Sequence, residues 1–355
     1  MNNFDKLSRI AIDLLKDLIK EKSFSKEEDH TANIIENFFK EKNIPANRKE
    51  NNVWAKNKHF DNNKKTVLLN SHHDTVKPNT DWTKDPFIPT IENGTLFGLG
   101  SNDAGGALVS LIITFLHFYE TKDLPFNIII VASAEEEISG KNGIELIIPK
   151  LGEIDFAIVG EPTNMEMAIA EKGLMVLDCI AKGKSGHAAR NEGNNAIYNA
   201  MKDIAWFNTF KFEDESKWLG PIKMSVTMIE SGTQHNVVPD ECKFVVDVRT
   251  TDILPNERLL GKIKKEVSCE VNARSTRLNP SGIKATHPII NVAKNLNIKT
   301  YGSPTLSDQA LMPFDSVKIG PGKSERSHTA DEFIQTEEIE NGINTYIKIL
   351  EHLNI

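Results

Sequence analysis

The chain has 355 residues, of which 39% are hydrophobic, and its 42 Lys plus Arg against 50 Asp plus Glu give a formal net charge of −8. This length exceeds what one core usually serves, so we expect two domains, or one large domain that carries an insertion. Acidic and basic residues are mixed along the chain, which excludes a polybasic nucleic-acid binder and an acidic-tail protein.

The cysteine content and the apolar segments bear on the cellular compartment of the protein and on whether it spans a membrane. Cys179, Cys242 and Cys269 cannot form a closed disulfide framework, and residues 1–5 begin no apolar signal segment. We therefore expect a cytoplasmic protein. The most apolar stretches, 107–118 and 126–134, are too short and too interrupted to span a bilayer, so we expect no membrane role.

The first half of the chain alternates strand and helix patterns. Apolar residues at helical spacing predict two amphipathic packing helices in the first forty residues. Three short apolar runs, at 66–70, 127–131 and 156–159, each end in polar or acidic residues, as buried strands do, and 105–119 has the length and apolar character of a helix. Ligands in open α/β sheets collect beyond the carboxyl ends of strands, so we expect these acids and histidines at one edge.

From about residue 172 the pattern changes to that of a smaller α+β unit. Strands are predicted at 174–181, 223–230 and 242–249, and helices near 195–207 and 256–267. After residues 280–282 the first pattern returns, with a strand at 315–320 and a helix at 337–353. The expected fold class is α/β: a discontinuous catalytic domain (1–172 plus 284–355), in which helices cover a mixed sheet, with an inserted α+β lid and dimerisation domain (173–283).

Acids and histidines cluster at the predicted strand ends. They are His72, Asp74, Asp103, Glu136, Glu137, Glu161 and His328. A lone histidine is more often a surface or satisfied core residue, and an acidic triplet such as 135–137 is usually a solvated face. Directly after a buried strand, however, packed carboxylates are costly unless a cation compensates them.

The donor types indicate which cation. Nitrogen and oxygen ligands without thiolate suit Zn²⁺, Co²⁺ or Mn²⁺ in a catalytic site. Two histidines are few for one ion. Shared between two ions with one bridging carboxylate, they give each ion one histidine, one terminal carboxylate and the bridge.

Five ordered segments resemble the motifs of the di-zinc amidohydrolases, the family of acetylornithine deacetylase, succinyl-diaminopimelate desuccinylase, carboxypeptidase G and the aminoacylases. The segments are His72-x-Asp74-x-Val76, Gly98–Asp103 with Gly105-Gly106, Ala134–Glu137, Gly160–Thr163 and Ser327–Glu332. They cover nearly the whole chain in a fitting order. The resemblance implies a zinc-peptidase-like fold and a hydrolase of linear amides with two Zn²⁺ ions, for which Co²⁺ or Mn²⁺ are alternatives.

The resemblance also implies individual roles. The implied metal ligands are His72 and Glu161 on one ion, Glu137 and His328 on the other, and Asp103 as the bridge. Asp74 would orient the imidazole of His72, and Glu136 would be the general base that takes a proton from the attacking water and returns it to the leaving amine. An alternative assignment, in which the base and the ligand of the triplet are each displaced by one residue, stays open, because Glu135 stands where relatives often have Asp. The likeness further implies a cis peptide bond between Asp103 and Ala104.

The inserted domain carries further likenesses. Segment 182–189 resembles the one whose histidine, here His187, reaches the partner subunit's active site and stabilises the oxyanion, which implies a homodimer through the lid domain. Segments 232–239 and 247–249 resemble those whose Asn and Arg, here Asn236 and Arg249, contact substrate. A turn role for His187 and an ordinary ion pair for Arg249 remain alternatives.

Two segments bear on the substrate, a small N-acyl amino acid. Glu171-Lys172-Gly173 stands where desuccinylases carry two arginines, and an acid there is expected to repel a dianionic substrate. Gly-Pro-Gly at 320–322 is closer to acetylornithine deacetylase, and Lys323 and Arg326 are candidates to hold an α-carboxylate. The sequence favours an N-acetyl- or N-succinyl-ornithine or -citrulline deacylase of arginine biosynthesis. The alternatives are a desuccinylase, a dipeptidase or aminoacylase, a mononuclear enzyme and an inactive scaffold protein.

Overall fold

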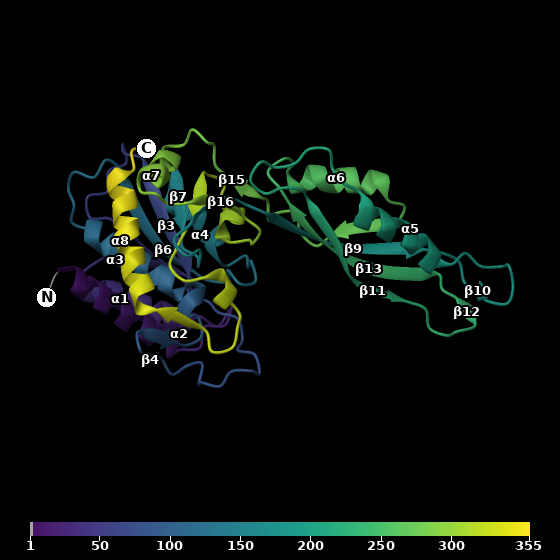
Figure 1. Cartoon of the computed structure of the whole chain (residues 1–355), viewed down its shortest axis with the longest axis horizontal. Helices are drawn as coiled ribbons and strands as arrows, with labels where there is room; N and C mark the ends of the chain where they lie inside the picture. Colours follow the sequence, from purple (N-terminus) through teal and green to yellow (C-terminus); the bar gives the residue numbers. More distant parts are fainter. Residues whose placement is uncertain (1–2) are drawn as a thin grey trace. The chain divides into compact units, whose positions relative to one another are not determined.

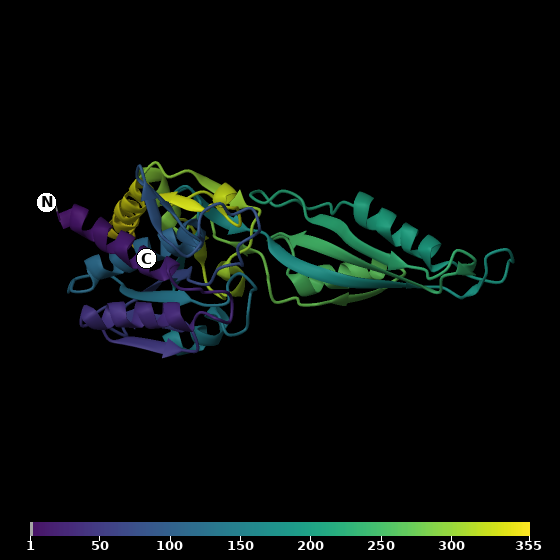
Figure 2. The same ribbon diagram turned by 90° about the horizontal axis from the view of Figure 1, so that it is seen from below.

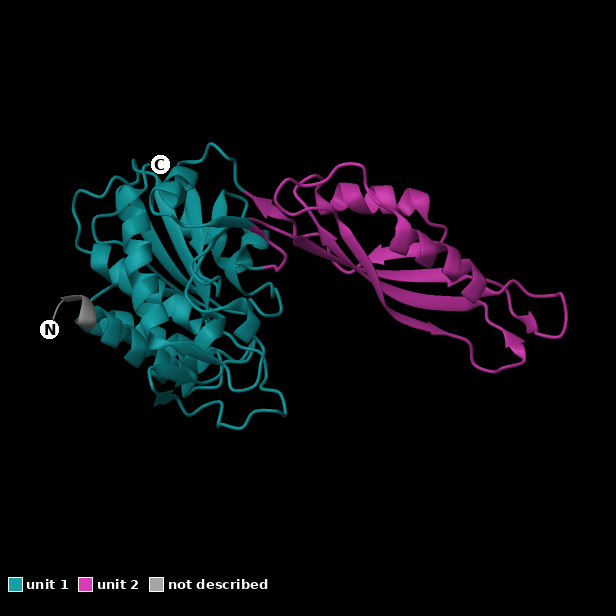
Figure 3. Cartoon of the chain, in the orientation of Figure 1, with its two compact units in different colours: residues 1–169, 283–301, 307–355 teal, residues 170–282, 302–306 magenta. Residues whose placement is uncertain are grey.

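The computed structural model describes residues 3–355, so residues 1–2 of the N-terminal segment discussed above lie outside it. The chain divides into two compact units (Figure 3). Unit 1 comprises Met1–Ile169, Ile283–Tyr301 and Ser307–Ile355, and unit 2 comprises Ala170–Gly282 and Gly302–Leu306. The first unit is therefore discontinuous in sequence, and the short segment 302–306, which no sequence pattern indicated, belongs with the second.

Unit 1 is built on a mixed sheet with the strand order β1-β2-β6-β3-β7-β17-β8 (Figure 1). The strands are β1 Ala46–Lys49, β2 Asn52–Lys56, β3 Thr66–His72, β6 Asn127–Ser133, β7 Phe156–Val159, β8 Met167–Glu171 and β17 Ser316–Lys318, with the short β15 Ser281–Gly282 and β16 Thr300–Ser303 on β8. Strand β3 runs parallel to β6 and β7, and β17 runs parallel to β7. Their carboxyl ends therefore share one edge of the sheet.

Helices cover both faces of this sheet. They are α1 Asn3–Ile19, α2 Asp29–Glu41, α3 Gly106–Phe118, α4 Ile144–Leu151, α7 Pro288–Asn295 and α8 Thr336–His352. Val67 and Leu69 of β3 pack in the core formed with α1, α2, α3, α7 and α8, whereas Leu68 packs in a second core with α4. Burial on both faces explains why β3 has an uninterrupted apolar run rather than an alternating pattern. Within residues 3–355, no helix combines the length and apolar character needed to cross a membrane.

The expected α/β architecture is confirmed, and the differences from the predicted elements are local. The predicted strand at 315–320 is shorter, Ser316–Lys318, because the chain then turns through Gly322, whose φ of 87° favours glycine. The small sheet of β4 Thr90–Glu92, β5 Thr95–Phe97 and β18 Phe333–Gln335 was not predicted. Its strands are three residues long, too short to show a periodic pattern.

Unit 2 contains a four-stranded antiparallel sheet in the order β11-β13-β9-β14. Its elements are β9 Gly173–Lys182, α5 Ala196–Thr209, β11 Lys223–Ser231, β13 Glu241–Thr250, α6 Asn256–Glu266 and β14 Glu270–Ala273, with the small pair β10 Gly186–His187 and β12 Val237–Val238. Alternate residues of β9, such as Met175 and Leu177, pack with Phe207 of α5 and Leu259 of α6. Both helices therefore cover one face of this sheet (Figure 2).

Candidate metal centre

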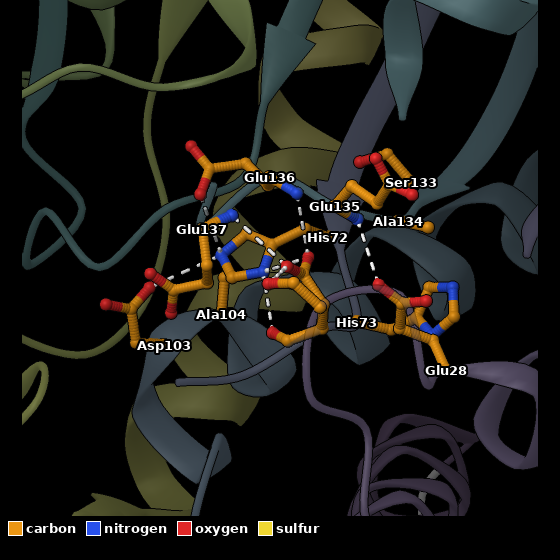
Figure 4. A network of polar contacts seen from close by, with 12 residues as sticks. Glu28, His72, His73, Asp103, Ala104, Ser133, Ala134, Glu135, Glu136 and Glu137 are labelled. Atoms are coloured by element: carbon orange, nitrogen blue, oxygen red, sulfur yellow. Dashed lines mark hydrogen bonds and ion pairs between the residues drawn. The ribbon is translucent and has the colours of Figure 1, made fainter. Parts of the chain in front are cut away.

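The shared strand edge of unit 1 brings acids and histidines from five segments together. His72 ends β3, the triplet 135–137 follows β6, and Glu161 follows β7. Asp103 lies in the π-helical turn η1 Ser101–Gly105 before α3, and His328 follows the 3₁₀ turn η3 Ser324–Arg326. Figure 4 shows Asp103, Glu136 and Glu137 around the ring of His72. The parallel strands explain this convergence, because each delivers its next residues to the same edge.

Asp103 lies between the two histidines. Its Oδ1 is 3.4 Å from Nε2 of His72, and its Oδ2 is 3.6 Å from Nε2 of His328. A second carboxylate accompanies each histidine: Glu161 Oε1 is 3.8 Å from His72 Nε2, and Glu137 Oε2 is 3.0 Å from His328 Nε2. The donors therefore form two histidine and carboxylate pairs that share one carboxylate.

The hydrogen bonding of His72 indicates a cation. Its Nδ1 lies 2.9 Å from the carbonyl oxygen of Asp74, which can only accept, so Nδ1 carries a proton. In the neutral ring Nε2 then presents a lone pair, yet this buried atom has no hydrogen-bond partner among residues 3–355 and faces carboxylate oxygens. Although burial opposes protonation, the carboxylates of Asp103 and Asp74 raise the pKa of His72 well above its usual value. A divalent cation would satisfy the lone pair and the carboxylates together, so the residues fit a metal.

The carboxylates also have perturbed proton affinities. Burial, with the charge of Asp103, raises the pKa of Glu161 to about 8. Burial, with the charges of Glu161 and Asp308, raises the pKa of Glu136 well above its usual value. A hydrogen bond with Glu137 raises the pKa of His328 to about 9. Packed negative charge of this kind needs protons or cations to balance it.

The three glutamates of the triplet differ in their contacts. The carboxylate of Glu135 accepts hydrogen bonds from Nδ2 and the backbone N–H of Asn142, and its φ is 53°. Glu137 contacts His328 at 3.0 Å, whereas Glu136 comes no closer than 4.0 Å to His72 Nε2. In the part of the chain that the structure describes, two three-residue sets of donors lie close enough to hold a metal, His72 with Asp103 and Glu137, and His72 with Glu136 and Glu161. We favour Asp103 over Glu136 as the ligand beside Glu161, because its two oxygens face different histidines and Glu136 is the more distant.

Asp74 holds the backbone of the triplet. Its Oδ1 accepts the N–H of Glu136 at 3.0 Å, and its Oδ2 accepts the N–H of Glu137 at 3.1 Å and the hydroxyl of Ser25 at 2.7 Å. Its carboxylate is 3.4 Å from Nδ1 of His72, farther than its own carbonyl oxygen. Asp74 therefore contacts the ring of His72, as its predicted orienting role requires, and it also holds the turn that carries the glutamates.

Glu332 is a positioning candidate to which the sequence analysis gave no role, although it ends the fifth motif. This buried carboxylate accepts the backbone N–H groups of Gly100 at 3.0 Å, Asn102 at 2.8 Å and Asp103 at 2.9 Å. It thereby fixes the turn that presents Asp103, and the predicted cis peptide between Asp103 and Ala104 is present in this turn. Burial, with the charge of Asp103, raises the pKa of Glu332 to about 8.

We expect Glu332→Gln to weaken metal binding about 10- to 100-fold, the usual effect of losing a residue that orients a ligand. Glutamine replaces one of the two acceptor oxygens with a donor, so at least one backbone N–H loses its partner. Metal affinity measured by competition with a chelating dye checks this. Glu325→Gln, on the exposed neighbouring turn, is the matched control. Unchanged affinity with a lower unfolding temperature would limit Glu332 to a structural role.

A buried polar network lies behind Glu135 (Figure 4). Glu28 accepts the N–H of Glu135 at 3.2 Å and Nδ2 of Asn51 at 2.8 Å. His73 contacts the hydroxyl of Thr31 through Nδ1 and the carbonyl oxygen of Asn51 through Nε2, both at 2.8 Å. Burial lowers the pKa of His73 to about 4, so this histidine is neutral in the folded chain.

His73 makes folding stability depend on pH. The unfolded chain binds a proton at this residue below about pH 6.5, whereas the folded chain binds it only below about pH 4, so the stability due to His73 falls as pH falls between these values. The shift corresponds to about 3 kcal/mol over this window. We expect His73→Gln to flatten the pH dependence of the free energy of unfolding, measured in urea with excess chelator. Parallel curves for both proteins would contradict this.

Lys323 and Arg326, the two residues predicted to hold a substrate carboxylate, differ in the contacts of their side chains. The backbone of Lys323 donates to Oδ1 of Asn102 at 2.9 Å, and its side chain is exposed. The guanidinium of Arg326 donates to both oxygens of Glu338 at 2.6 and 3.2 Å and lies over the ring of Phe333. Because Arg326 is already paired at the start of α8, its contacts favour a structural role over the predicted substrate contact.

The remaining predicted residues belong to unit 2. His187 and Asn236 lie in neighbouring segments, where the N–H of Ala188 donates to the carbonyl oxygen of Asn236 at 3.0 Å and both side chains are exposed. Arg249, on β13, makes an ion pair with Asp247 at 2.9 Å. The exposed His187 and Asn236 are free to meet a ligand or a second subunit, whereas Arg249 already has one acidic partner.

Comparison with known proteins decides the family. Residues 68–352 match the family described as Peptidase family M20/M25/M40. The chain belongs to this family. Its membership confirms the expected class, a metal-dependent amide hydrolase.

Relatives across the family differ in what they act on. The chain is 27% identical to a [LysW]-lysine/[LysW]-ornithine hydrolase of Sulfurisphaera tokodaii, over 98% of this chain and 97% of that protein. It is 30% identical to an acetylornithine deacetylase of Proteus mirabilis over 77% and 76%, and 24% identical to a succinyl-diaminopimelate desuccinylase of Psychromonas ingrahamii over 96% and 97%.

Solved structures share the fold. Aminopeptidase PepT of Bacillus cereus aligns with a TM-score of 0.78 at 18% identity, over 97% of this chain and 98% of that one. The YXEP protein of Bacillus subtilis, described as a dinuclear metal binding peptidase from the M20 family, aligns with a TM-score of 0.71 at 16% identity, over 98% and 100%. The fold of this chain thus occurs in solved structures with different names.

Proposed function

We propose that this chain removes the acyl group from an N-acyl amino acid with two Zn²⁺ ions, and that its substrate is an N-acyl-ornithine or N-acyl-citrulline of arginine biosynthesis in the cytoplasm. The main support for two metal ions is the position of Asp103, whose two oxygens face His72 and His328. Each histidine has its own further carboxylate, Glu161 or Glu137. Two ions that share one carboxylate need this set of donors.

The proposed chemistry assigns tasks to residues of this chain. The ions supply Lewis acidity, which lowers the pKa of water and polarises an amide carbonyl. Glu136 accepts a proton from the attacking water and returns it to the leaving amine, for which its raised pKa is suited. Asp74 holds Glu136 in place through the backbone N–H of that residue. His187 donates to the oxygen on which negative charge develops.

The substrate assignment rests on the relatives and on one loop. Relatives named acetylornithine deacetylase and [LysW]-lysine/[LysW]-ornithine hydrolase act on ornithine derivatives by name. The Gly-Pro-Gly turn at 320–322 and Lys323 next to it support the same assignment through the resemblance given above. A succinyl-diaminopimelate desuccinylase is the second candidate, because several relatives carry that name.

A substrate panel tests this proposal. The zinc-loaded chain is incubated with N-acetyl and N-succinyl derivatives of ornithine, citrulline and diaminopimelate, and with dipeptides, and the released amine is quantified. We expect turnover of an ornithine or citrulline derivative with kcat/KM at least about tenfold above the others. Preference for the diaminopimelate derivative or for dipeptides would overturn the substrate assignment while leaving the hydrolase class intact.

The proposal includes a homodimer in which His187 serves the partner's active site. Mixing His187→Ala and Glu136→Ala subunits is expected to restore up to about a quarter of wild-type activity, because one site of a mixed dimer then combines intact residues from both chains. Native mass spectrometry checks that mixed dimers have formed. Mixed dimers with no recovered activity would contradict the role of His187 across the interface.

A further inference from the structure

Asp308 is a buried carboxylate that the proposed chemistry does not use. It begins the 3₁₀ turn η2 Asp308–Leu311 of unit 1, and the residue is 3% exposed. Its Oδ2 accepts a hydrogen bond from Nδ2 of Asn70 at 2.8 Å and another from the hydroxyl of Ser133 at 2.7 Å. Because burying a carboxylate costs free energy unless its charge is compensated, the position of Asp308 calls for a physical explanation.

Both donors to Asp308 lie on the same face of the sheet as His72. Asn70 precedes His72 by two residues in β3, and Ser133 of β6 is directly opposite His72 in the parallel pairing. Leu68, a further two residues back in β3, packs with α4, so this is the face that α4 covers. The carboxylate of Asp308 therefore lies on the face of His72, close to the strand end that delivers this ligand.

Electrostatic interactions agree with this position. Burial raises the pKa of Asp308 to about 6, although its two hydrogen bonds and the charge of His72 act in the opposite direction. The charge of Asp308 in turn adds to burial and to the charge of Glu161 in raising the pKa of Glu136. At pH 7.5 Asp308 is thus an anion whose charge reaches both His72 and the proposed base.

The proposed metal centre can use a further negative charge. Its ligands include three carboxylates, Asp103, Glu137 and Glu161, which balance only part of the charge of two divalent ions. In the interior of a protein a nearby carboxylate acts on a cation without touching it, and its effect falls with distance. A buried anion on the face of His72 is therefore expected to act mainly on the ion that this histidine binds.

We propose that Asp308 is a remote carboxylate that strengthens the binding of the ion held by His72 and leaves the ion held by His328 little affected. This inference rests on the proposed function. The hydrogen bonds from Asn70 and Ser133 hold the carboxylate in place, so its charge acts without rearrangement when an ion binds. Asp308 thus acts through its fixed charge and is not itself a ligand.

Asp308→Asn removes the charge with little change of shape. The amide keeps an oxygen that can accept hydrogen bonds from Asn70 and Ser133. Zinc affinity is measured at pH 7.5, where the wild-type carboxylate is ionised, by competition with a chelating dye. Unfolding in excess chelator checks that the variant folds, and Asp308→Ala, which removes the same charge, takes its place if it does not.

Two backgrounds separate the ions. The His328→Ala background is expected to keep the ion of His72, and the Glu161→Ala background is expected to keep the ion of His328. We expect Asp308→Asn to weaken zinc binding about 10- to 100-fold in the His328→Ala background. In the Glu161→Ala background the loss should stay below about threefold, because the remaining ion is farther from the removed charge.

Two controls separate the charge of Asp308 from other effects. Asp155→Asn makes the same substitution at the opposite end of β3, where Asp155 accepts the N–H of Thr66 at 2.9 Å. This variant should leave zinc affinity within about twofold of the wild-type value, because its charge lies far from the metal centre. Ser133→Ala removes one hydrogen bond but keeps the charge, so it should weaken zinc binding by less than about threefold.

Unchanged zinc affinity in Asp308→Asn and Asp308→Ala would overturn the inference. Equal losses in both backgrounds, or a loss in Ser133→Ala as large as that in Asp308→Asn, would also overturn it, because Asp308 would then only hold the strand ends together. A wild-type chain that binds no zinc would overturn the proposed function together with the inference. The other results leave the proposed function standing.

Discussion

Glu136→Gln is expected to lower kcat by about 10²- to 10⁴-fold while the chain keeps its metal, because a general base contributes about this much and Glu136 is not among the proposed ligands. The substitution removes the carboxylate but keeps the backbone N–H that Asp74 accepts. Activity on the best substrate of the panel and metal content by plasma mass spectrometry check the two parts separately.

Glu135→Gln is the matched control for this variant. Glu135 lies next to the proposed base, but its carboxylate bonds Asn142 instead of facing the histidines. We expect Glu135→Gln to retain activity within about tenfold, since one of its hydrogen bonds is kept. Loss of metal together with activity in Glu136→Gln would show that Glu136 is a ligand and that the triplet is assigned one residue out.

Asp103→Ala is expected to release both ions, whereas His328→Ala is expected to release one. The reason is that Asp103 presents one oxygen toward each histidine, while His328 has contacts only with Asp103 and Glu137 in the cluster. Removing a ligand should weaken binding by at least about 100-fold, more than the loss of a residue that only orients one. The number of ions per chain, measured after dialysis against trace metal, distinguishes these cases.

Glu161→Ala is the counterpart of His328→Ala on the other ion, so it should also leave one ion per chain. If Asp103→Ala keeps one ion tightly, the carboxylate is terminal rather than bridging. If the wild-type chain binds about one ion at saturation, the mononuclear alternative replaces the two-metal proposal. Both outcomes are read from metal content and do not depend on the choice of substrate.

The parts of the fold that could be predicted are those with a strong local pattern. The runs at 66–70, 127–131 and 156–159 predicted β3, β6 and β7, because strands buried on both faces must be continuously apolar. The same runs placed His72 and the triplet at strand ends, and the parallel arrangement then placed them at one edge. By contrast, β4, β5 and β18 have three residues each and no period to detect.

The resemblance to a metal-dependent amide hydrolase and the side chains available as ligands can be read from the sequence, because those residues stand in ordered motifs beside buried strands. What each charged side chain faces depends on the packing of the folded chain. Arg326 pairs with Glu338, the carboxylate of Glu332 accepts N–H groups of the turn that carries Asp103, and Glu171 is buried while Lys172 is partly exposed. These contacts join residues far apart in the chain or depend on which face of a strand is covered, and a local pattern of residue types carries neither kind of information.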